Sequence, residues 1–266
     1  MAGAVRGEWT VDSGQWTESS TEPTPNDSPS PVCASLSTVH CPLSTVSVII
    51  PTLNESPVIA DAVAKARALS PLEIIVVDGG STDGTLERAV EAEQRLSSPR
   101  GRAIQQNTGA AAARGDVLLF LHADCWLEPG SLAAVEAAVR DPACVGGCFQ
   151  QRIDADGWRY RWLERGNALR AKLWTLAYGD QGIFVRRDVF HRLGGFPPLS
   201  FMEDLFFMKR LRREGRFTLL DSRLHVSARR WQQHGFVRQT LRNWTLTALA
   251  QAGVSPDRLA RFYRAR

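Results

Sequence analysis

Lysine is scarce in this chain of 266 residues, which has 32 lysines and arginines together but only three lysines, Lys65, Lys172 and Lys209. Arginine therefore carries almost all of the positive charge, a bias typical of a high-GC genome. The sequence also lacks a helix-turn-helix, zinc-finger spacing and a basic-aromatic strand pattern. We therefore expect no nucleic-acid partner.

Cysteine is used sparingly too. The five cysteines form no CxxC pair, and Cys144 and Cys148 have no further cysteine or histidine nearby that would complete a metal site. This spacing disfavours a structural zinc site, and the odd number of cysteines disfavours a disulfide framework. A reducing, cytoplasmic compartment is the natural expectation.

Long hydrophobic runs are absent. No run of about 18 uncharged apolar residues occurs, so we expect no transmembrane helix. The first residues lack the basic region and apolar core of a secretory signal, and their acidity disfavours a transit peptide. A hydrophobic share of 44% is ordinary for a folded core, which disfavours a wholly disordered, collagen-like or coiled-coil chain.

The content of charged residues and of proline changes near residue 44. Residues 1–44 contain Arg6 against five acidic residues, and they hold five of the 14 prolines. Such a segment buries too little apolar surface to fold, so we expect a disordered tail, or a start codon assigned too early. Residues 45–266 carry the excess of positive charge and are predicted to form a single domain that binds an anionic ligand.

Short apolar runs alternate with helical patterns from Val46 onward. Continuous apolar runs of four to six residues are typical of strands buried on both faces, hence of a parallel sheet built from βαβ units, and the fold class is predicted to be α/β. The expected strands are Val46–Ile50, Glu73–Val77 and Val117–Leu121, and the expected helices are Glu55–Leu69, Thr85–Leu96, Ile104–Arg114 and Ser131–Val139.

The second half is predicted to extend this sheet and to cover it with helices, the last of which forms a C-terminal helical extension. The expected strands here are Cys148–Ile153, Gly182–Val185, Phe217–Leu220 and Leu224–Val226, and the expected helices are Glu203–Glu214 and Phe236–Ala252.

Three polar loops follow expected strands, at Pro51–Glu55, Asp78–Gly84 and His122–Asp124. Ligands of open parallel sheets bind at the carboxyl ends of the strands, so these loops are predicted to form one site. Turn and helix-capping chemistry alone explains any one of them. The loops contain neither GxGxxG nor GxxxxGK. A carboxylate such as Asp124 at a strand end suits Mg²⁺ or Mn²⁺, because hard cations prefer oxygen ligands.

Four runs of sequence, in this order, resemble glycosyltransferase family 2, the inverting enzymes of the GT-A fold. They are SVIIPTLNE, IIVVDGGSTDGT, GRAIQQNTGAAAARGDVLLFLHAD and MEDLFFMKRLRREGR, and the resemblance spans about Val46–Trp231. His-Ala-Asp, Gly-Asp-Gln-Gly and Ser-x-Arg-Arg-Trp resemble a bacterial subgroup sometimes linked to arsenosugar biosynthesis or carotenoid-type acceptors. The resemblance implies a Rossmann-like, mostly parallel sheet flanked by helices.

The resemblance also implies a donor-nucleotide site. Asp78 would bind the base edge and Asp83 would close the pocket beside it, and an arginine suits the diphosphate because its planar fork donates paired hydrogen bonds. Asp124 corresponds to the metal-binding aspartate of the Asp-x-Asp motif. His122 stands where the family has the first aspartate, as a ligand to Mn²⁺ or a contact to the ribose. The implied donor-binding residues are Pro51, Glu55, Asp78, Asp83, Arg102, Asn107, His122 and Asp124.

Asp204 is the implied catalytic base, and Glu203 is the alternative base or a residue that positions the acceptor. In an inverting transfer the acceptor hydroxyl attacks the face opposite the leaving nucleoside diphosphate, so a carboxylate must take its proton. The structural alternative is that both acids only stabilise the first turn of a helix against its dipole.

Two later motifs are implied to contact the acceptor or the diphosphate. One is Asp180 with Gln181, and the other is Arg229, Arg230 and Trp231. A basic edge with an apolar anchor explains the second motif equally well. The tryptophan- and arginine-rich segment 158–176 is typical either of a helix that contacts lipid headgroups or a lipid-linked acceptor, or of a helix packed over the active site.

The sequence thus predicts a metal-dependent, inverting glycosyltransferase that uses a nucleotide-sugar donor, with a UDP-sugar as the first guess, and an unidentified hydroxyl acceptor. A catalytically inactive nucleotide-binding or regulatory module of the same fold is the alternative, and His122 favours it. Nucleotidyl transfer is disfavoured because no glycine-rich, lysine-containing loop follows the first strand. We expect a cytoplasmic protein, with peripheral association at the inner face of the membrane as the alternative.

Overall fold

The computed structural model describes residues 46–174, 177–199, 201–256 and 258–260, together with two short strands, β1 (Val11–Asp12) and β2 (Gln15–Trp16), that pair antiparallel. The rest of the predicted tail, residues 1–44, lies outside the described residues. Residues 1–41 and 42–266 separate into two compact units. The second unit contains the predicted domain.

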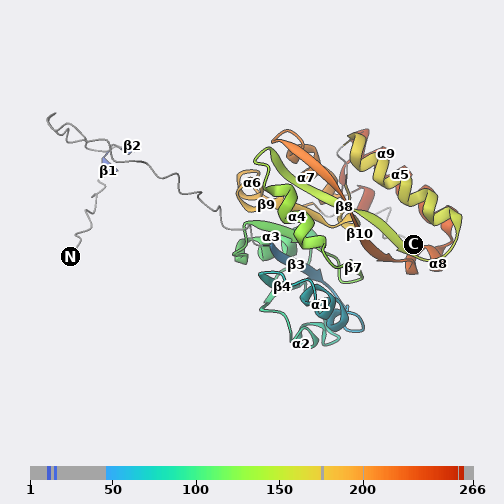
Figure 1. The fold of residues 1–266 in the computed structure, drawn as a ribbon, viewed down its shortest axis with the longest axis horizontal. Coiled ribbons are helices and arrows are strands. Elements are labelled where there is room, and N and C mark those ends of the chain that lie inside the picture. The colour runs from blue at the N-terminus through green and yellow to red at the C-terminus, as the bar shows by residue number, and fades with distance from the viewer. Residues whose placement is uncertain are drawn as a thin grey trace, which may run out of the picture. The chain divides into compact units, whose positions relative to one another are not determined.

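The described part of this unit is built on an eight-stranded sheet with the order β5-β4-β3-β6-β9-β8-β10-β7 (Figure 1). The half that comes first in the chain is parallel, with β3 between β4 and β6 and with β5 beside β4. These strands are β3 (Val46–Thr52), β4 (Glu73–Asp78), β5 (Gln94–Ser97) and β6 (Val117–Phe120). Since parallel strands end at the same edge, the loops after β4, β3 and β6 are neighbours.

The other half of the sheet is mixed. β9 is antiparallel to both of its neighbours, β6 and β8, whereas β10 runs parallel to β8 and pairs antiparallel with β7. The strands are β7 (Cys125–Leu127), β8 (Cys144–Asp154), β9 (Ile183–Arg186) and β10 (Arg216–Ser227). The predicted α/β fold class is confirmed.

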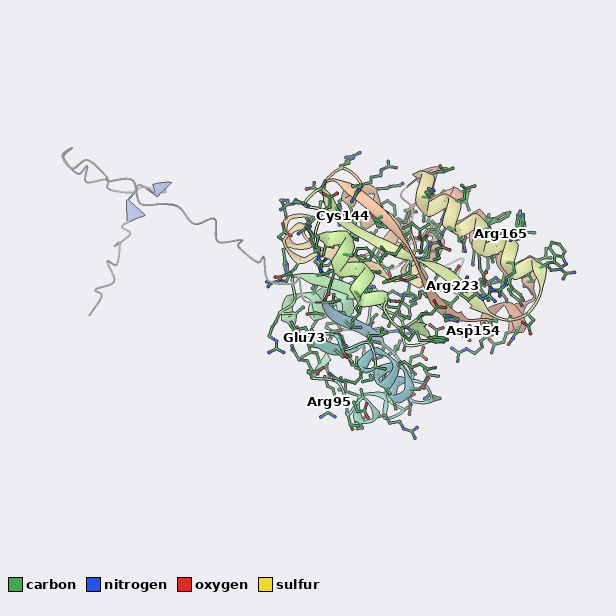
Figure 2. The ribbon with its side chains drawn as sticks, viewed as in Figure 1. Glu73, Arg95, Cys144, Asp154, Arg165 and Arg223 are labelled. Carbon is green, nitrogen blue, oxygen red and sulfur yellow. The ribbon has the colours of Figure 1, made fainter. Side chains whose placement is uncertain are left out.

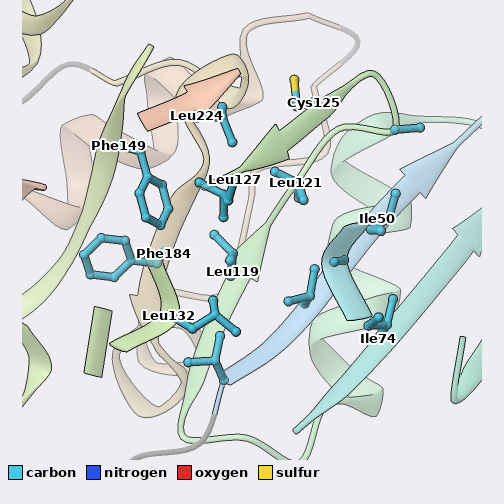
Figure 3. Close-up of a cluster of buried hydrophobic side chains, with 14 of the residues drawn as sticks. Ile50, Ile74, Leu119, Leu121, Cys125, Leu127, Leu132, Phe149, Phe184 and Leu224 are labelled. Atoms are coloured by element: carbon cyan, nitrogen blue, oxygen red, sulfur yellow. The ribbon is translucent and has the colours of Figure 1, made fainter. Parts of the chain in front are cut away.

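Both faces of the sheet are buried, as the continuous apolar runs predict. On β3, Val48 and Ile50 point into one hydrophobic layer (Figure 3) and Ile49 points into the other. The first layer is covered by α1 (Ile59–Arg67) and α4 (Ser131–Val139). The second is covered by α3 (Arg102–Ala112), α6 (Arg187–Arg192) and α7 (Glu203–Leu211).

The remaining helices lie around the second half of the sheet. They are α2 (Thr85–Arg88), α5 (Trp158–Trp174), the 3-10 turn η1 (Gly179–Gln181), α8 (Arg229–His234) and α9 (Phe236–Gln251). α9 packs through Leu246 and Ala250 against Leu205 of α7. None of the described helices is long and apolar enough to cross a membrane.

One predicted element is wrong. The segment Thr85–Leu96 forms a helix only over Thr85–Arg88, and Gln94–Ser97 forms the edge strand β5. Pairing with β4 decides the structure of this stretch, because an edge strand with alternating half-buried and exposed residues carries a weak local signal. The two strands expected at 217–226 are one strand, β10, whose register shifts between Leu220 and Arg223.

Candidate functional site

The loops after β3 and β4 are held together by hydrogen bonds. The N–H of Asn54 donates to the Ser81 hydroxyl at 2.8 Å, and Oδ1 of Asn54 accepts the N–H of Thr82 at 3.1 Å. The N–H of Ser56 donates to Oδ2 of Asp83 at 3.1 Å. Two of the three predicted loops therefore form one continuous rim, and Pro51 and Glu55 lie on it, half-buried.

Two aspartates of this rim, Asp78 and Asp83, hold its backbone through hydrogen bonds. Asp78 is buried at the end of β4, and its Oδ2 accepts the N–H groups of Gly80 and Ser81 at 3.0 and 2.8 Å. Oδ1 of Asp83 accepts the hydroxyl and the N–H of Thr85, at the start of α2. The hydrogen bond from the Thr85 hydroxyl is the main cause that lowers the pKa of Asp83. Both carboxylates therefore accept hydrogen bonds within the predicted donor site: Asp78 from the turn after β4, and Asp83 from the first residue of α2.

The third loop groups three side chains of metal-ligand type. His122, Asp124 and Cys125 offer ligand atoms that all lie within 4.8 Å of one another. Imidazole and carboxylate suit Mn²⁺ or Mg²⁺, whereas a thiol suits softer metals, so His122 and Asp124 fit the predicted cation and Cys125 is the less suited third group. Cys125 was not predicted for the site, because a lone cysteine carries no metal-site spacing.

Asp124 also lines a pocket of about 260 Å³ between α1 and the start of α8, and Arg229 lines the same pocket. This volume is slightly below the range typical of small-molecule sites, roughly 300–1,000 Å³. The structure therefore brings together a predicted metal ligand and an arginine predicted to contact the acceptor or the diphosphate. Trp231 is half-buried and packs on the hydrophobic core, and the side chain of Arg230 lies outside the described residues.

Asp204 and the third loop both lie close to Gly179. The N–H of Gly179 donates to Oδ2 of Asp204 at 2.8 Å, while Oδ1 of Asp204 accepts the N–H of Leu205 at 2.7 Å. A β-carbon added at Gly179 would lie 2.9 Å from Nε2 of His122 and 3.6 Å from Oδ2 of Asp204. The predicted base and the predicted metal loop therefore both lie next to one glycine. Met202, just before α7, has a left-handed backbone with φ of 60°, a strained conformation for this residue type.

Glu203 and Arg102 are also brought together, across the first turns of α7 and α3. Their closest charged atoms are 3.3 Å apart, and Glu203 is buried while Arg102 is 44% exposed at its side chain. Burial raises the pKa of the Glu203 carboxyl, the charge of Arg102 opposes this increase and that of Asp204 adds to it. Arg102 thus links the predicted donor site to the predicted catalytic acids.

Asn107 has a partner that the sequence did not indicate. Its side-chain amide donates to the carbonyl of Phe196 at 2.8 Å and accepts the N–H of Phe196 at 2.9 Å. Both polar atoms of the amide are therefore engaged in holding the loop between α6 and α7. The structure gives Asn107 a role in the fold.

Asp180 and Gln181 belong to a polar network that reaches α5. Oδ2 of Asp180 accepts from Nε2 of Gln151 at 2.9 Å, and Oε1 of Gln181 accepts from Arg170 at 2.8 Å. The Arg170 guanidinium lies 3.9 Å from the centre of the Tyr178 ring. Nε2 of Gln181 has no acceptor among the described residues, and the whole Gln181 side chain is buried. Sequence reasoning missed Gln151 and Arg170, since only packing brings them to this turn.

Residues 47–195 match the family model described as Glycosyl transferase family 2. Glycosyltransferase AglE of Haloferax volcanii is 30% identical over an alignment of 181 residues, and the match covers 57% of this chain and 56% of that protein. A PGL/p-HBAD biosynthesis glycosyltransferase of Mycobacterium bovis is 34% identical over an alignment of 167 residues, and the match covers 56% of this chain and 62% of that protein. The chain thus spans less than two thirds of the length of these relatives.

Solved structures share the fold. The mannosyltransferase PcManGT from Pyrobaculum calidifontis, in complex with GDP-Man and Mn²⁺, superposes with a TM-score of 0.61 at 22% identity, over 80% of this chain and 66% of that one. TarS (residues 1–349) of S. aureus, in complex with UDP-GlcNAc, gives a TM-score of 0.55 at 19% identity, over 69% and 58% of the two chains. With its matched family model and this GT-A architecture, the chain belongs to glycosyltransferase family 2.

Proposed function

We propose that this protein is a metal-dependent, inverting glycosyltransferase that moves a sugar from a nucleotide-sugar donor, with a UDP-sugar as the first candidate, to a hydroxyl acceptor. The observation that carries the proposal is the position of Gly179 next to both His122 and Asp204, which brings a metal-type loop and a carboxylate into one site. The complexes of structural neighbours with GDP-Man and Mn²⁺, and with UDP-GlcNAc, support a nucleotide-sugar donor.

Asp204 is the proposed base. Its carboxylate takes the proton of the acceptor hydroxyl as that oxygen bonds to the anomeric carbon, and the bond from this carbon to the diphosphate oxygen breaks on the opposite face. The hydrogen bond from Gly179 fixes the carboxylate for this task. Glu203, whose pKa is raised by burial, is the proposed positioning residue beside it rather than the base, because Arg102 already pairs with it.

The leaving diphosphate needs positive charge. His122 and Asp124 would hold Mn²⁺ or Mg²⁺, which when bound stabilises the negative charge of the leaving group. Arg229 lines the same pocket as Asp124 and is the proposed cation of the protein itself. The rim of Pro51, Glu55, Asp78 and Asp83 is proposed to receive the nucleoside.

The proposed catalytic domain is residues 45–266, with α8 and α9 as its C-terminal extension. Asp180 and Gln181 are proposed to contact the sugar or the acceptor, because they lie on the same η1 turn as Gly179, whose N–H binds the proposed base Asp204. A lipid-linked acceptor is one candidate, and it would require the enzyme to work at a membrane surface. We propose a cytoplasmic location on the grounds of cysteine usage.

A donor screen tests the proposal. Purified protein is incubated with UDP-, GDP- and other nucleotide-sugars and Mn²⁺, with water as the hydroxyl acceptor in the absence of the natural one. The sugar passes to water, and the released nucleoside diphosphate is measured with Asp124→Ala as the control. We expect at least one donor to be consumed by the wild type and not by the variant. If UDP and GDP bind in calorimetry without any enhancement by Mn²⁺, and no donor is consumed, the protein is the inactive nucleotide-binding module that the His122 substitution favours.

A further inference from the structure

The outer face of α5 carries a stripe of exposed apolar side chains. Trp158, Trp162, Leu169 and Leu173 are 74%, 57%, 54% and 61% exposed. Their spacing of four, seven and four residues places them on one side of the helix. Core residues of α5 such as Ala171 point the other way, into the second hydrophobic layer. Trp158 and Trp162, the two tryptophans of this stripe, are therefore not core residues of the segment predicted as a helix at 158–176.

A second stripe on α9 continues the first. Val237, Leu241 and Trp244 are 62%, 54% and 47% exposed, and they too are spaced by four and three residues. The rings of Trp162 and Trp244 have centroids 6.0 Å apart, so the two stripes meet at this pair of rings. We call the set of these seven side chains the α5/α9 face.

Positive charge surrounds the α5/α9 face. Arg159, Arg165, Lys172 and Arg238 are exposed on the two helices, and Arg165 is labelled on α5 in Figure 2. The sequence of α9 contains no acidic residue, and the single acid of α5, Glu164, is half-buried and pairs with Arg161 at 2.9 Å. An exposed apolar surface with a cationic border is complementary to a layer of lipids with anionic headgroups.

We propose that the α5/α9 face docks the protein onto a membrane surface that contains anionic phospholipids. The tryptophans and leucines lie at the boundary between headgroups and acyl chains, and the arginines and Lys172 contact the phosphates. Large exposed apolar patches are rare on proteins that stay in water. Two helices with apolar stripes, flanking cations and no exposed acidic side chain match the pattern of helices that lie on an anionic lipid surface. The helices lie along the surface and do not span the bilayer, consistent with their lengths and apolarity.

Side chains on the opposite side of α5 form hydrogen bonds with residues of the candidate active site. Asn167 donates to Gln151 at 2.6 Å, and Arg170 donates to Gln181 at 2.8 Å. Docking through the outer side therefore holds the η1 turn one helix away from the lipid headgroups. If the protein transfers sugars as proposed, this arrangement favours a lipid-linked acceptor, whereas the docking itself does not depend on any transfer activity.

Flotation of the full-length protein with lipid vesicles tests the docking. Vesicles of phosphatidylcholine alone are compared with vesicles that contain about 30% phosphatidylglycerol. We expect the protein to float with the anionic vesicles. The double variant Trp158→Ala, Leu173→Ala should bind these vesicles at least tenfold more weakly, on the order expected for two large apolar side chains that no longer enter the interface. Arg159→Glu with Arg165→Glu should also weaken binding, with the largest effect at low salt.

Val90→Ala is the matched control, because Val90 is 68% exposed but lies outside the α5/α9 face. This variant should float like the wild type, and all variants should keep the wild-type thermal unfolding midpoint. The proposal is overturned if the wild type does not float, or if the Trp158, Leu173 variant floats equally well. It is also overturned if light scattering finds a dimer that this variant converts to a monomer, because a second copy would then cover the face. Donor consumption, measured without vesicles, reports on the proposed function separately.

Discussion

The N–H of Gly179 donates a 2.8 Å hydrogen bond to Oδ2 of Asp204, and the same glycine packs against the imidazole of His122. The η1 turn thereby joins the loop after β6 to the first turn of α7. The absence of a side chain at residue 179 allows this approach, since a β-carbon there would lie 2.9 Å from Nε2 of His122. The arrangement leads to the first prediction.

Gly179→Ala should reduce sugar transfer by about a hundredfold, because displacement of a catalytic group by about an ångström has an effect of this size. The added methyl group must push His122 or the η1 turn away. Steady-state rates of nucleoside diphosphate release measure the effect. Gly166→Ala is the matched control: a β-carbon at this position of α5 meets nothing within 4 Å, so activity should be unchanged. Equal activity of both variants would contradict the role of Gly179.

Asp204→Asn should lower turnover by roughly 10²–10⁴-fold, the usual contribution of a general base. Asparagine can still accept the hydrogen bond from Gly179 through its carbonyl oxygen, but it cannot take a proton. Calorimetric titration with the donor nucleotide should give an unchanged Kd. If the variant turns over as fast as the wild type, Asp204 is not the base. Its role would then be limited to the hydrogen bond that it accepts at the start of α7.

Glu203 should make stability depend on pH in a defined direction. Burial raises the pKa of Glu203 above its ordinary value of 4.5, so the folded state binds this proton more tightly than the unfolded state. The contribution to the free energy of unfolding is therefore full below pH 4.5 and is lost as the pH rises through the raised pKa. Urea denaturation of wild type and Glu203→Gln across this range measures it: the stability of the wild type relative to the variant should fall as the pH rises. A constant difference between the two proteins would contradict the pKa shift.

Asn107→Ala should destabilise the fold by about 2–3 kcal/mol, because it removes two hydrogen bonds to the backbone of Phe196. Donor affinity should change little, since both polar atoms of the amide are already used. Thermal unfolding and nucleotide titration of the same variant separate the two effects. A loss of donor affinity at unchanged stability would instead support the nucleotide-binding role implied by the family resemblance.

Local sequence pattern was enough for three of the four parallel strands and for several helices. The apolar runs at β3, β4 and β6 predicted buried strands, and α4 has the predicted bounds, Ser131–Val139. The edge strand β5 and the short strand β7 were missed. Their residues form strands because a neighbouring strand offers hydrogen bonds, and such partners do not appear in the local pattern.

The sequence by itself determined the order of the motifs and the polar loops at the ends of the strands, because alternation of apolar runs and turn residues is a local property. It also supplied the tryptophans and arginines of α5. Only the tertiary structure decided which of these residues meet: Gly179 with Asp204, Asn107 with Phe196, Arg102 with Glu203, and Trp162 with Trp244. Each of these pairs joins segments that are far apart in the sequence. Their contacts depend on how helices and strands pack against one another, which short-range propensities do not specify.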